Sequence, residues 1–305
     1  MRALMLFNPT AHRGKGSQRL ERVRERLAGL DLLEVQTTGS LEGDTVLVRD
    51  ALDDGIRMLV AAGGDGTVHS VVNAVWRITG GAPPDDIVLG AVGLGSSNDF
   101  HKPTRDPVPC RLDFERRAAR DVVAVRFEGP SGVAERVFVV SASLGVTAEA
   151  NAFFNREDRV LRRLKRSFTA AAIPYAALRT IGSFSGYPAR LKICGERLVC
   201  DVSNLSVLKT PFVSGDLRFD VDVTPDDGDV AVALCDGMTR GELLRTLLAL
   251  YRGEFTGRQK TRVWRAPALS VDTDRSVPLE LDGEIVHAHS MAFQVHHRWL
   301  SVCGS

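Results

Sequence analysis

The residues best placed to do chemistry form a glycine-rich turn, Gly63-Gly64-Asp65-Gly66-Thr67. An apolar run, residues 59–62, precedes this turn, and valines at helical spacing follow it over residues 68–75. This order predicts a buried strand, a tight turn and an amphipathic helix. Backbone N–H groups at the start of a helix attract anions, most of all where no side chain stands in front of them. A simple βα turn would need less glycine, so we predict a phosphate site here.

Two further polar loops follow predicted strands in the same half of the chain. The first, residues 8–16, carries Arg13 and Lys15, and the other covers residues 93–100. Taken alone, the first loop is best interpreted as a solvated basic turn. In a parallel sheet, however, the loops at the carboxyl ends of the strands lie along one edge, where ligands bind. We therefore expect all three loops to line one phosphate site.

Two familiar nucleotide-binding motifs do not account for this site. The sequence has no GxxxxGK[ST] pattern, so the glycine-rich turn is not a Walker A loop. The loop that starts at Gly93 begins like GxGxxG but lacks the third glycine of the dinucleotide fingerprint. The glycine-rich turn therefore belongs to another class of phosphate loop.

Length and composition are those of an ordinary soluble protein. A chain of 305 residues predicts two domains, and a net charge of +1 gives no case for nucleic acid as a partner. Five cysteines without CxxC spacing indicate free thiols in a reducing compartment and no zinc site. No apolar run approaches the roughly 20 residues of a membrane span, and the start of the chain is too short for a signal peptide. We predict a cytoplasmic protein, with contact to a membrane surface left open.

The predicted elements divide the chain near Arg120. Residues 1–120 alternate strands and helices, which predicts an α/β domain with a parallel sheet that carries the phosphate site. Residues 121–305 contain short strands and frequent turns, which predict a β-sandwich domain whose last strand can return to the first domain. A hairpin connection is expected at residues 128–132. The predicted strands are 3–7, 32–36, 59–62, 87–92, 122–127, 136–143, 189–193, 197–202, 205–208, 217–223, 230–234, 268–271, 279–281 and 285–287.

Helices are predicted between several of these strands. One covers residues 20–30 with Ser17 as its candidate cap, and another follows residues 32–36 with Asp44 as its candidate cap. A third covers residues 242–251. An arginine-rich helical insert lies near residues 151–186. It fits two interpretations equally: a solvated helix face, or an interfacial helix whose cations meet anionic lipid headgroups.

The three loops together resemble those of a known enzyme family. GGDGT after a buried strand resembles the signature of diacylglycerol, sphingosine and ceramide kinases, which NAD kinases and, more distantly, phosphofructokinases share. The first loop resembles the NPxxGxGK-type loop of the lipid kinases. Residues 93–100 resemble their PxGTxNDF element, which separates this chain from NAD kinases. Two residues depart from the pattern: Gly93 replaces a usual proline, and Ser70 replaces a common glutamate.

The resemblance implies a set of site residues. Ser96 takes the position of a nucleotide-contacting threonine, Thr38 (or Thr37) matches another, and Asp65 would organise Mg²⁺ and phosphate. The implied nucleotide-binding residues are Asn8, Thr10, Arg13, Lys15, Thr38, Gly63, Gly64, Asp65, Gly66, Thr67, Ser96, Asn98 and Asp99.

Two acidic motifs in the second half complete the resemblance. Asp226-Asp227-Gly228-Asp229 fits a simple turn. It also resembles the family's DG turn, which implies a structural Mg²⁺ held by the Asp227 carboxylate and by backbone oxygens of Thr224 and Asp229. Leu281-Asp282-Gly283-Glu284 fits an ordinary hairpin turn. It also resembles the family's LDGE motif, which implies that Glu284 is the general base.

The resemblance predicts an ATP- and Mg²⁺-dependent lipid kinase that transfers the γ-phosphoryl group to a lipid hydroxyl. The acceptor would be diacylglycerol-like or sphingoid, met peripherally at the inner face of a membrane, and the sequence leaves a homodimer open. One alternative is an NAD kinase, because that group shares GGDGT. Another is a nucleotide-binding regulator without turnover, because Ser70 removes a carboxylate.

Overall fold

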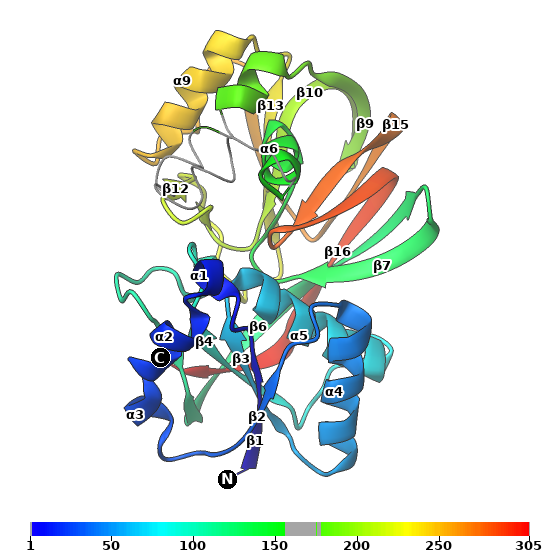
Figure 1. Ribbon diagram of the computed structural model, residues 1–305. Helices are drawn as coiled ribbons and strands as arrows, with labels where there is room; N and C mark the ends of the chain where they lie inside the picture. Colours follow the sequence, from blue (N-terminus) through cyan, green and yellow to red (C-terminus); the bar gives the residue numbers. More distant parts are fainter. Residues whose placement is uncertain (1, 156–174, 176–177, 305) are drawn as a thin grey trace.

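The protein folds into two lobes that share long strands (Figure 1). The structure is a computed structural model and describes residues 2–155, 175 and 178–304. The first lobe contains most of the residues before β6 (Asp113–Gly129), and the second contains most of those after it. The end of the described chain lies back in the first lobe.

The first lobe is built on a parallel sheet. Its strands are β1 (Arg2–Phe7), β2 (Asp31–Gln36), β3 (Met58–Gly63) and β4 (Val88–Gly93), in the order β4-β3-β1-β2. β3 and β4 are buried along their whole length, as an apolar run without alternation predicts. The carboxyl ends of β1, β3 and β4 therefore bring the three predicted loops to one edge.

Helices cover both faces of this sheet (Figure 1). On one face lie α4 (Leu41–Asp53) and α5 (Asp65–Thr79), whose apolar residues pack with Leu4, Leu6 and Leu59. On the other lie α1 (Ala11–Gly14), α2 (Gly16–Glu21) and α3 (Arg24–Leu27). They pack with Ala3, Met5 and Phe7. Alternate residues of β1 thus face opposite layers, as its pleat requires.

Three local predictions for these helices were wrong. The helix expected over residues 20–30 is broken at Val23, whose φ of −121° leaves the helical region, although its apolar face is buried as predicted. Ser17 does not cap, because α2 already begins at Gly16. Asp44 does not cap α4 either: the Ser40 hydroxyl accepts the Gly43 N–H at 3.1 Å and takes that role.

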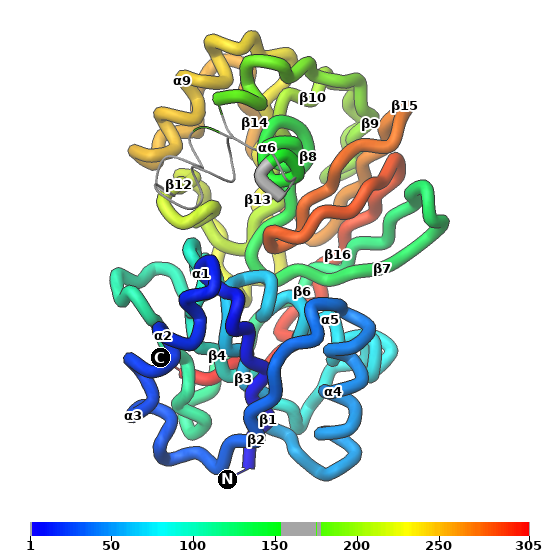
Figure 2. The backbone as a smooth tube through the Cα atoms, viewed as in Figure 1, coloured from blue at the N-terminus to red at the C-terminus, as the bar shows by residue number. Residues whose placement is uncertain are grey.

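Two long strands join the lobes (Figure 2). β16 (Glu284–Gly304) pairs antiparallel with β6, and near its end it pairs parallel with β4, Ser301 opposite Val88. The last strand thus pairs with the sheet of the first lobe. β6 passes without interruption through Arg120, the predicted boundary, because both lobes use it.

The second lobe consists mainly of antiparallel strands around an apolar core. β9 shows the clean alternation of buried and exposed residues that a half-buried strand requires. The strands of this lobe are β7 (Gly132–Phe138), β8 (Ser141–Gly145), β9 (Tyr187–Ile193), β10 (Glu196–Leu208), β13 (Val230–Asp236), β14 (Thr261–Ala266) and β15 (Ala268–Leu281). Shorter pieces are β5 (Cys110–Arg111), β11 (Phe212–Val213) and β12 (Leu217–Arg218).

Several predicted strands of this lobe differ in extent. The strand expected over residues 136–143 is split at Val139 and Val140, and the one expected over 217–223 shrinks to β12. Two predicted pairs merge into β10 and β15, each with an irregularity where a break was expected. The β6–β7 hairpin turns over two residues, Pro130 and Ser131, inside the predicted connection.

Two helices accompany these strands. α9 (Arg240–Leu250) begins with a capping box between Thr239 and Glu242, close to the predicted helix. α6 (Val146–Asn155) leads into the arginine-rich insert, most of which lies outside the described residues. Within the described residues, no helix is long and apolar enough to cross a membrane.

Candidate functional site

The glycine-rich turn has the predicted geometry. β3 ends at Gly63, α5 begins at Asp65, and no side chain of the described part of the chain caps this helix. A Cβ on Gly95 would lie 2.6 Å from the Gly64 Cα, so the turn and the third loop touch through glycine backbone. The N-terminus of α5 therefore has no side-chain cap, and its N–H groups and dipole make it a candidate anion site.

Asp65 braces the third loop. Its Oδ1 accepts the Phe100 N–H at 2.9 Å, at the 3₁₀ turn η1 (Asp99–His101). Burial raises the pKa of the Asp65 carboxyl, and the charge of Asp282 adds to this effect, although N–H donors from Phe100 and Asp99 oppose it. Besides its predicted role with Mg²⁺ and phosphate, Asp65 therefore stabilises the third loop.

Asn98 and Asp99 mainly stabilise the third loop through hydrogen bonds to backbone groups. The Asn98 side chain accepts the Gly95 N–H at 2.9 Å and donates to the Gly93 carbonyl at 3.1 Å, so it closes the third loop on itself. Asp99 accepts the Gly215 N–H at 2.9 Å and ties this loop to the second lobe. Burial and the nearby charge of Asp65 raise the pKa of Asp99 to about 7.

The first loop meets the third through a residue that the sequence analysis did not single out. His12 Nδ1 lies 3.2 Å from the Ser96 hydroxyl. Burial and the charges of Arg19, Arg13 and Lys15 lower the pKa of His12. Arg13 and Lys15 are exposed beside this contact. The two predicted cations therefore lie exposed at the edge of the candidate anion site.

Asn8 and Thr10 belong to the frame of the first loop. The Asn8 side-chain oxygen accepts both the N–H and the hydroxyl of Thr10, at 3.0 and 2.7 Å. This pair fixes the exit of β1 and turns the loop toward Ser96.

In the loop after β2, Thr38 is hydrogen-bonded to the buried carboxylate of Asp44. The N–H and hydroxyl of Thr38 donate to Asp44 Oδ1 at 2.7 and 3.0 Å. The other Asp44 oxygen accepts the Ser70 hydroxyl at 2.6 Å. Asp44 therefore places a carboxylate beside Ser70, the position where the resembling family commonly has glutamate.

Glu284 reaches the glycine-rich turn from the second lobe. It lies at the β15–β16 turn, exposed, and a Cβ built on Gly66 would lie 3.0 Å from its Oε1. The structure thus brings Glu284 and the anion site together, although they are far apart in the sequence. Gly66 leaves the space that this carboxylate uses.

The turn that carries Glu284 is held by buried acids. Asp282 accepts the N–H groups of Val139, Val140 and Ser141 at 3.0, 2.9 and 3.1 Å, which explains why β7 and β8 are separate. Glu280 accepts the Gly283 N–H and the Ser143 hydroxyl, the latter at 2.7 Å. Burial raises the pKa of Glu280 to about 7. Glu280 was not predicted as a site residue. In the sequence it is marked only as an acidic residue within an apolar strand.

Arg120 connects this turn to the third loop. Its guanidinium is buried, lies 4.2 Å from the Phe100 ring centre, and donates to the Phe100 and Val139 carbonyls at 3.4 and 3.2 Å. Burial and the charge of Arg111 lower its pKa to about 10. One buried cation thus contacts both segments that hold the acids of the site.

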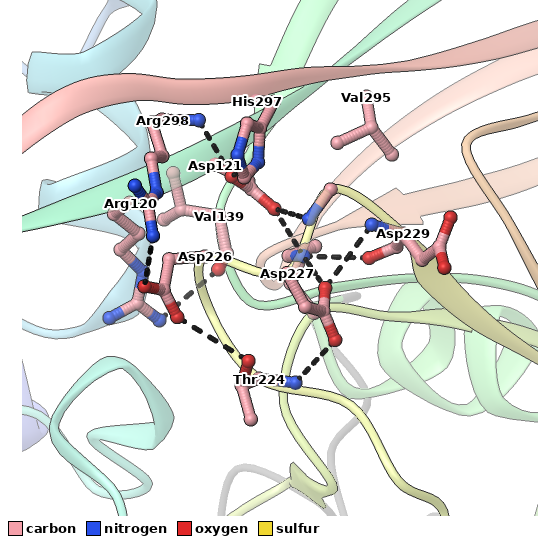
Figure 3. A network of polar contacts seen from close by, with 12 residues as sticks. Arg120, Asp121, Val139, Thr224, Asp226, Asp227, Asp229, Val295, His297 and Arg298 are labelled. Atoms are coloured by element: carbon pink, nitrogen blue, oxygen red, sulfur yellow. Dashed lines mark hydrogen bonds and ion pairs between the residues drawn. The ribbon is translucent and has the colours of Figure 1, made fainter.

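The DG turn, Asp226 to Asp229, does not fit the predicted Mg²⁺ site. Lys209 Nζ lies 2.8 Å from Asp227 Oδ1 and 2.6 Å from the Asp229 carbonyl, two of the predicted ligands. Thr224 turns its N–H, at 2.8 Å, toward Asp227 Oδ2 (Figure 3). No group of three or more acidic, histidine or cysteine side chains suited to a metal occurs in the described ranges. A lysine ammonium therefore stands where the cation was expected.

Comparisons with known proteins agree with this arrangement. A family model described as "Diacylglycerol kinase catalytic domain" matches residues 2–120. Another, described as "YegS C-terminal NAD kinase beta sandwich-like domain", matches residues 140–304. The diacylglycerol kinase of Bacillus subtilis (strain 168) is 25% identical over 289 residues, which cover 93% of this chain and 89% of that protein. That of Mycobacterium tuberculosis (strain ATCC 25618 / H37Rv) is 25% identical over 303 residues, which cover 92% and 90%.

Solved structures share the fold. The crystal structure of a diacylglycerol kinase from Bacillus anthracis str. Sterne aligns with a TM-score of 0.65 at 16% identity, covering 100% of this chain and 97% of that one. Yeast NADH kinase complexed with NADH aligns with a TM-score of 0.52 at 9% identity, covering 100% and 84%. The predicted fold class is confirmed. Both domain matches and the curated relatives show that the chain belongs to the diacylglycerol kinase-like family of lipid kinases, phosphotransferases whose acceptor is an alcohol.

Proposed function

We propose that this chain transfers the γ-phosphoryl group of ATP to the hydroxyl of a diacylglycerol-like or sphingoid lipid. The observation that carries the proposal is the position of Glu284 Oε1, 3.0 Å from the point where a Cβ on Gly66 would lie. An exposed carboxylate thus stands directly over an anion site at a helix N-terminus. A phosphate donor and a proton acceptor are the two things that such a kinase must bring together.

ATP would lie along the edge formed by the three loops. Its phosphates would rest on the N-terminus of α5, where bare N–H groups and the helix dipole favour negative charge. Arg13 and Lys15 would add positive charge from the first loop. Ser96, held by His12 at 3.2 Å, would present its hydroxyl to the nucleotide.

Mg²⁺ would accompany ATP beside Asp65. Burial raises the pKa values of Asp65 and Asp99 because it disfavours their charged forms, and a divalent cation brought with the nucleotide would stabilise those charges. Bound there, the ion would neutralise charge on the phosphates.

Glu284 would take the proton of the lipid hydroxyl. As that proton leaves, the hydroxyl oxygen bonds to the γ-phosphorus, the bond from phosphorus to the β–γ bridging oxygen breaks, and ADP departs. Because the transition state of phosphoryl transfer is loose, positioning and charge neutralisation should contribute more than the base.

Labelled ATP with a panel of acceptors in mixed micelles tests the proposal. Diacylglycerol, sphingosine, ceramide and phosphatidylglycerol each present a hydroxyl beside apolar chains, and NAD serves as the non-lipid acceptor. A labelled lipid supports the proposal. Labelled NAD alone would assign an NAD kinase, and ATP binding without any labelled product would assign a regulator.

The lipid would be met at a membrane surface. The arginines of residues 156–166, which lie outside the described residues, supply positive charge by sequence, so binding to anionic vesicles should weaken as salt screens it. Replacing Arg159, Arg162, Arg163 and Arg166 with glutamate should abolish vesicle binding and leave ATP binding intact. Unchanged vesicle binding would remove this segment from the proposal.

A further inference from the structure

We propose that the ammonium group of Lys209 replaces the structural divalent cation that the DG turn was expected to hold, so that this chain needs no metal there. The inference concerns the junction of the two lobes and goes beyond the proposed function, because it holds whichever acceptor is phosphorylated.

The contacts of Lys209 use its whole bonding capacity. Its Nζ lies 2.7 Å from Asp121 Oδ2, 2.8 Å from Asp227 Oδ1 and 2.6 Å from the Asp229 carbonyl oxygen. An ammonium has three N–H donors, and here each has one acceptor. The side chain is 0% exposed, so water does not compete for these donors.

The three acceptors are the kind that a hard cation takes. Two are carboxylate oxygens and one is a backbone carbonyl, a mixed set typical of Mg²⁺ or Ca²⁺ sites. They converge on one point, and that point is the nitrogen of Lys209. A metal ion and this ammonium therefore cannot occupy the site together.

The charges at this point require a cation of some kind. The side chains of Asp121 and Asp227 are 0% and 17% exposed, so two carboxylates face each other with little water. Buried carboxylates are stable only when they are paired and hydrogen-bonded. Arg265 and His297 also contact these acids, but their side chains are 41% and 52% exposed. Lys209 is thus the buried partner.

Asp121 extends the cluster to the strands that join the lobes. Its Oδ1 accepts the Arg298 N–H at 2.7 Å and lies 3.1 Å from His297 Nδ1, both on β16 (Figure 3). Its Oδ2 also accepts the Gly228 N–H at 2.8 Å, and its own N–H donates to the Pro225 carbonyl at 2.7 Å. The positive charge on Lys209 therefore holds the DG turn against β6 and β16.

Thermal unfolding without nucleotide tests the inference. The protein, Lys209→Ala and Lys209→Met are each melted in EDTA and in millimolar Mg²⁺ or Ca²⁺ at matched ionic strength. The unsubstituted protein should show the same midpoint in all three solutions, because its cation is covalently attached. Lys209→Ala should melt roughly 5–10 °C lower, since two buried carboxylates lose their partner.

The two variants separate a lost contact from a vacated cation site. Lys209→Ala opens space among the three oxygens, so a divalent cation should bind the folded state and restore part of the lost midpoint. Lys209→Met fills the same space with an uncharged chain, so it should melt low and show no response to divalent cations. This difference would not appear if Lys209 served only as packing.

Two results would overturn the inference. One is a rise of the unsubstituted protein's midpoint in Mg²⁺ that Asp227→Asn abolishes, because it would show a metal at the DG turn despite Lys209. The other is a folded Lys209→Ala that no divalent cation stabilises. If Lys209→Ala does not fold, the measurement on the unsubstituted protein and Asp227→Asn still decides.

Discussion

Two regions of this molecule are rich in aspartate, but the pKa values of these aspartates are shifted in opposite directions. At the phosphate edge, burial raises the pKa of Asp65 and, with the charge of Asp65, that of Asp99 to about 7. At the DG turn, burial also acts on Asp227, but the hydrogen bond from Lys209 and N–H donors from Thr224 and Asp229 leave its pKa below the usual value. Burial thus dominates the pKa values in the first region, whereas hydrogen bonds from a buried lysine and from N–H groups outweigh it in the second.

The two regions are therefore suited to different roles: cation binding at the phosphate edge and structural support at the DG turn. Acids whose charge is disfavoured by burial would be stabilised by Mg²⁺ brought with ATP, whereas acids paired with a buried lysine offer nothing to an incoming ion. Both regions looked like cation sites in the sequence, because both place aspartate beside glycine. The deciding residue is Lys209, and it lies 88 positions from Asp121.

Positioning and charge neutralisation are shared among several groups, so the largest loss of turnover from a single substitution is expected at the carboxylate beside the glycine-rich turn. Glu284→Gln should lower turnover by roughly 10²–10⁴-fold, toward the lower end because the transition state is loose. ATP affinity should stay nearly unchanged, because the residue serves the acceptor hydroxyl. Steady-state kinetics on the lipid that the panel identifies would measure both. Glu196→Gln, another exposed glutamate at a strand turn, is the control; parental turnover in Glu284→Gln would refute the assignment.

Asp65→Asn should reduce both ATP affinity and turnover, the latter by roughly 10²–10³-fold, because a charge that balances Mg²⁺ and phosphate is lost. The amide oxygen can still accept the Phe100 N–H, so the third loop should keep its shape. Titration with Mg²⁺ and ATP measures the affinity, and steady-state kinetics measures the turnover. Asp50→Asn, at an exposed aspartate, is the control. Unchanged affinity would mean that Asp65 only braces the loop.

Glu280→Gln tests, through the free energy of unfolding, how strongly burial disfavours the charged form of an acid near the site. The ordinary pKa of this carboxyl is 4.5 and its folded value is about 7, so between these values the unfolded chain releases a proton that the folded chain keeps. The free energy of unfolding therefore falls as pH rises through this window and stays lower above it. Relative to the parent, Glu280→Gln should gain on the order of 2 kcal/mol from pH 4.5 to 7. Denaturant unfolding at several pH values measures this gain, and a difference independent of pH would contradict it.

The smallest effect is expected at the outer cation of the DG turn. Arg265 lies 3.0 Å from Asp227, but its side chain is 41% exposed, so water and salt screen the pair. Arg265→Ala should cost less than about 1 kcal/mol in the free energy of unfolding. Lys209→Met, measured in the same denaturant series, should cost several times more. Equal losses would erase the distinction between the buried and the exposed partner.

Local sequence pattern was sufficient for the fold class and for the sheet edge where the candidate site lies. Apolar runs and glycine turns located β3, α5 and the edge of the sheet, because these depend on neighbours in the chain. Pattern could not give the hydrogen-bond partners of individual side chains. Asn98 closes its own loop, Asp282 binds three N–H groups of the β7–β8 link, and His12 meets Ser96. These roles depend on the exact path of a loop or on how distant segments pack, which periodicity does not encode.

The smaller errors have similar causes. Ser17 and Asp44 have the right chemistry for caps, but Lys15 and Ser40 occupy the N-cap positions of α2 and α4. Asp44 instead serves Thr38 and Ser70, a use that requires α4 and α5 to lie side by side. Cap residues can be recognised from sequence, whereas the choice among neighbouring candidates is made by packing.

The long final strand has a consequence for how the protein is made. β16 pairs with β4 at Val88 and Leu89 in the sheet of the first lobe, and it is synthesised after the other strands described here. While the ribosome is still translating the second lobe, the nascent first lobe exposes this part of the edge of β4, where another chain could pair. Completion of the first lobe therefore waits until β16 has been synthesised.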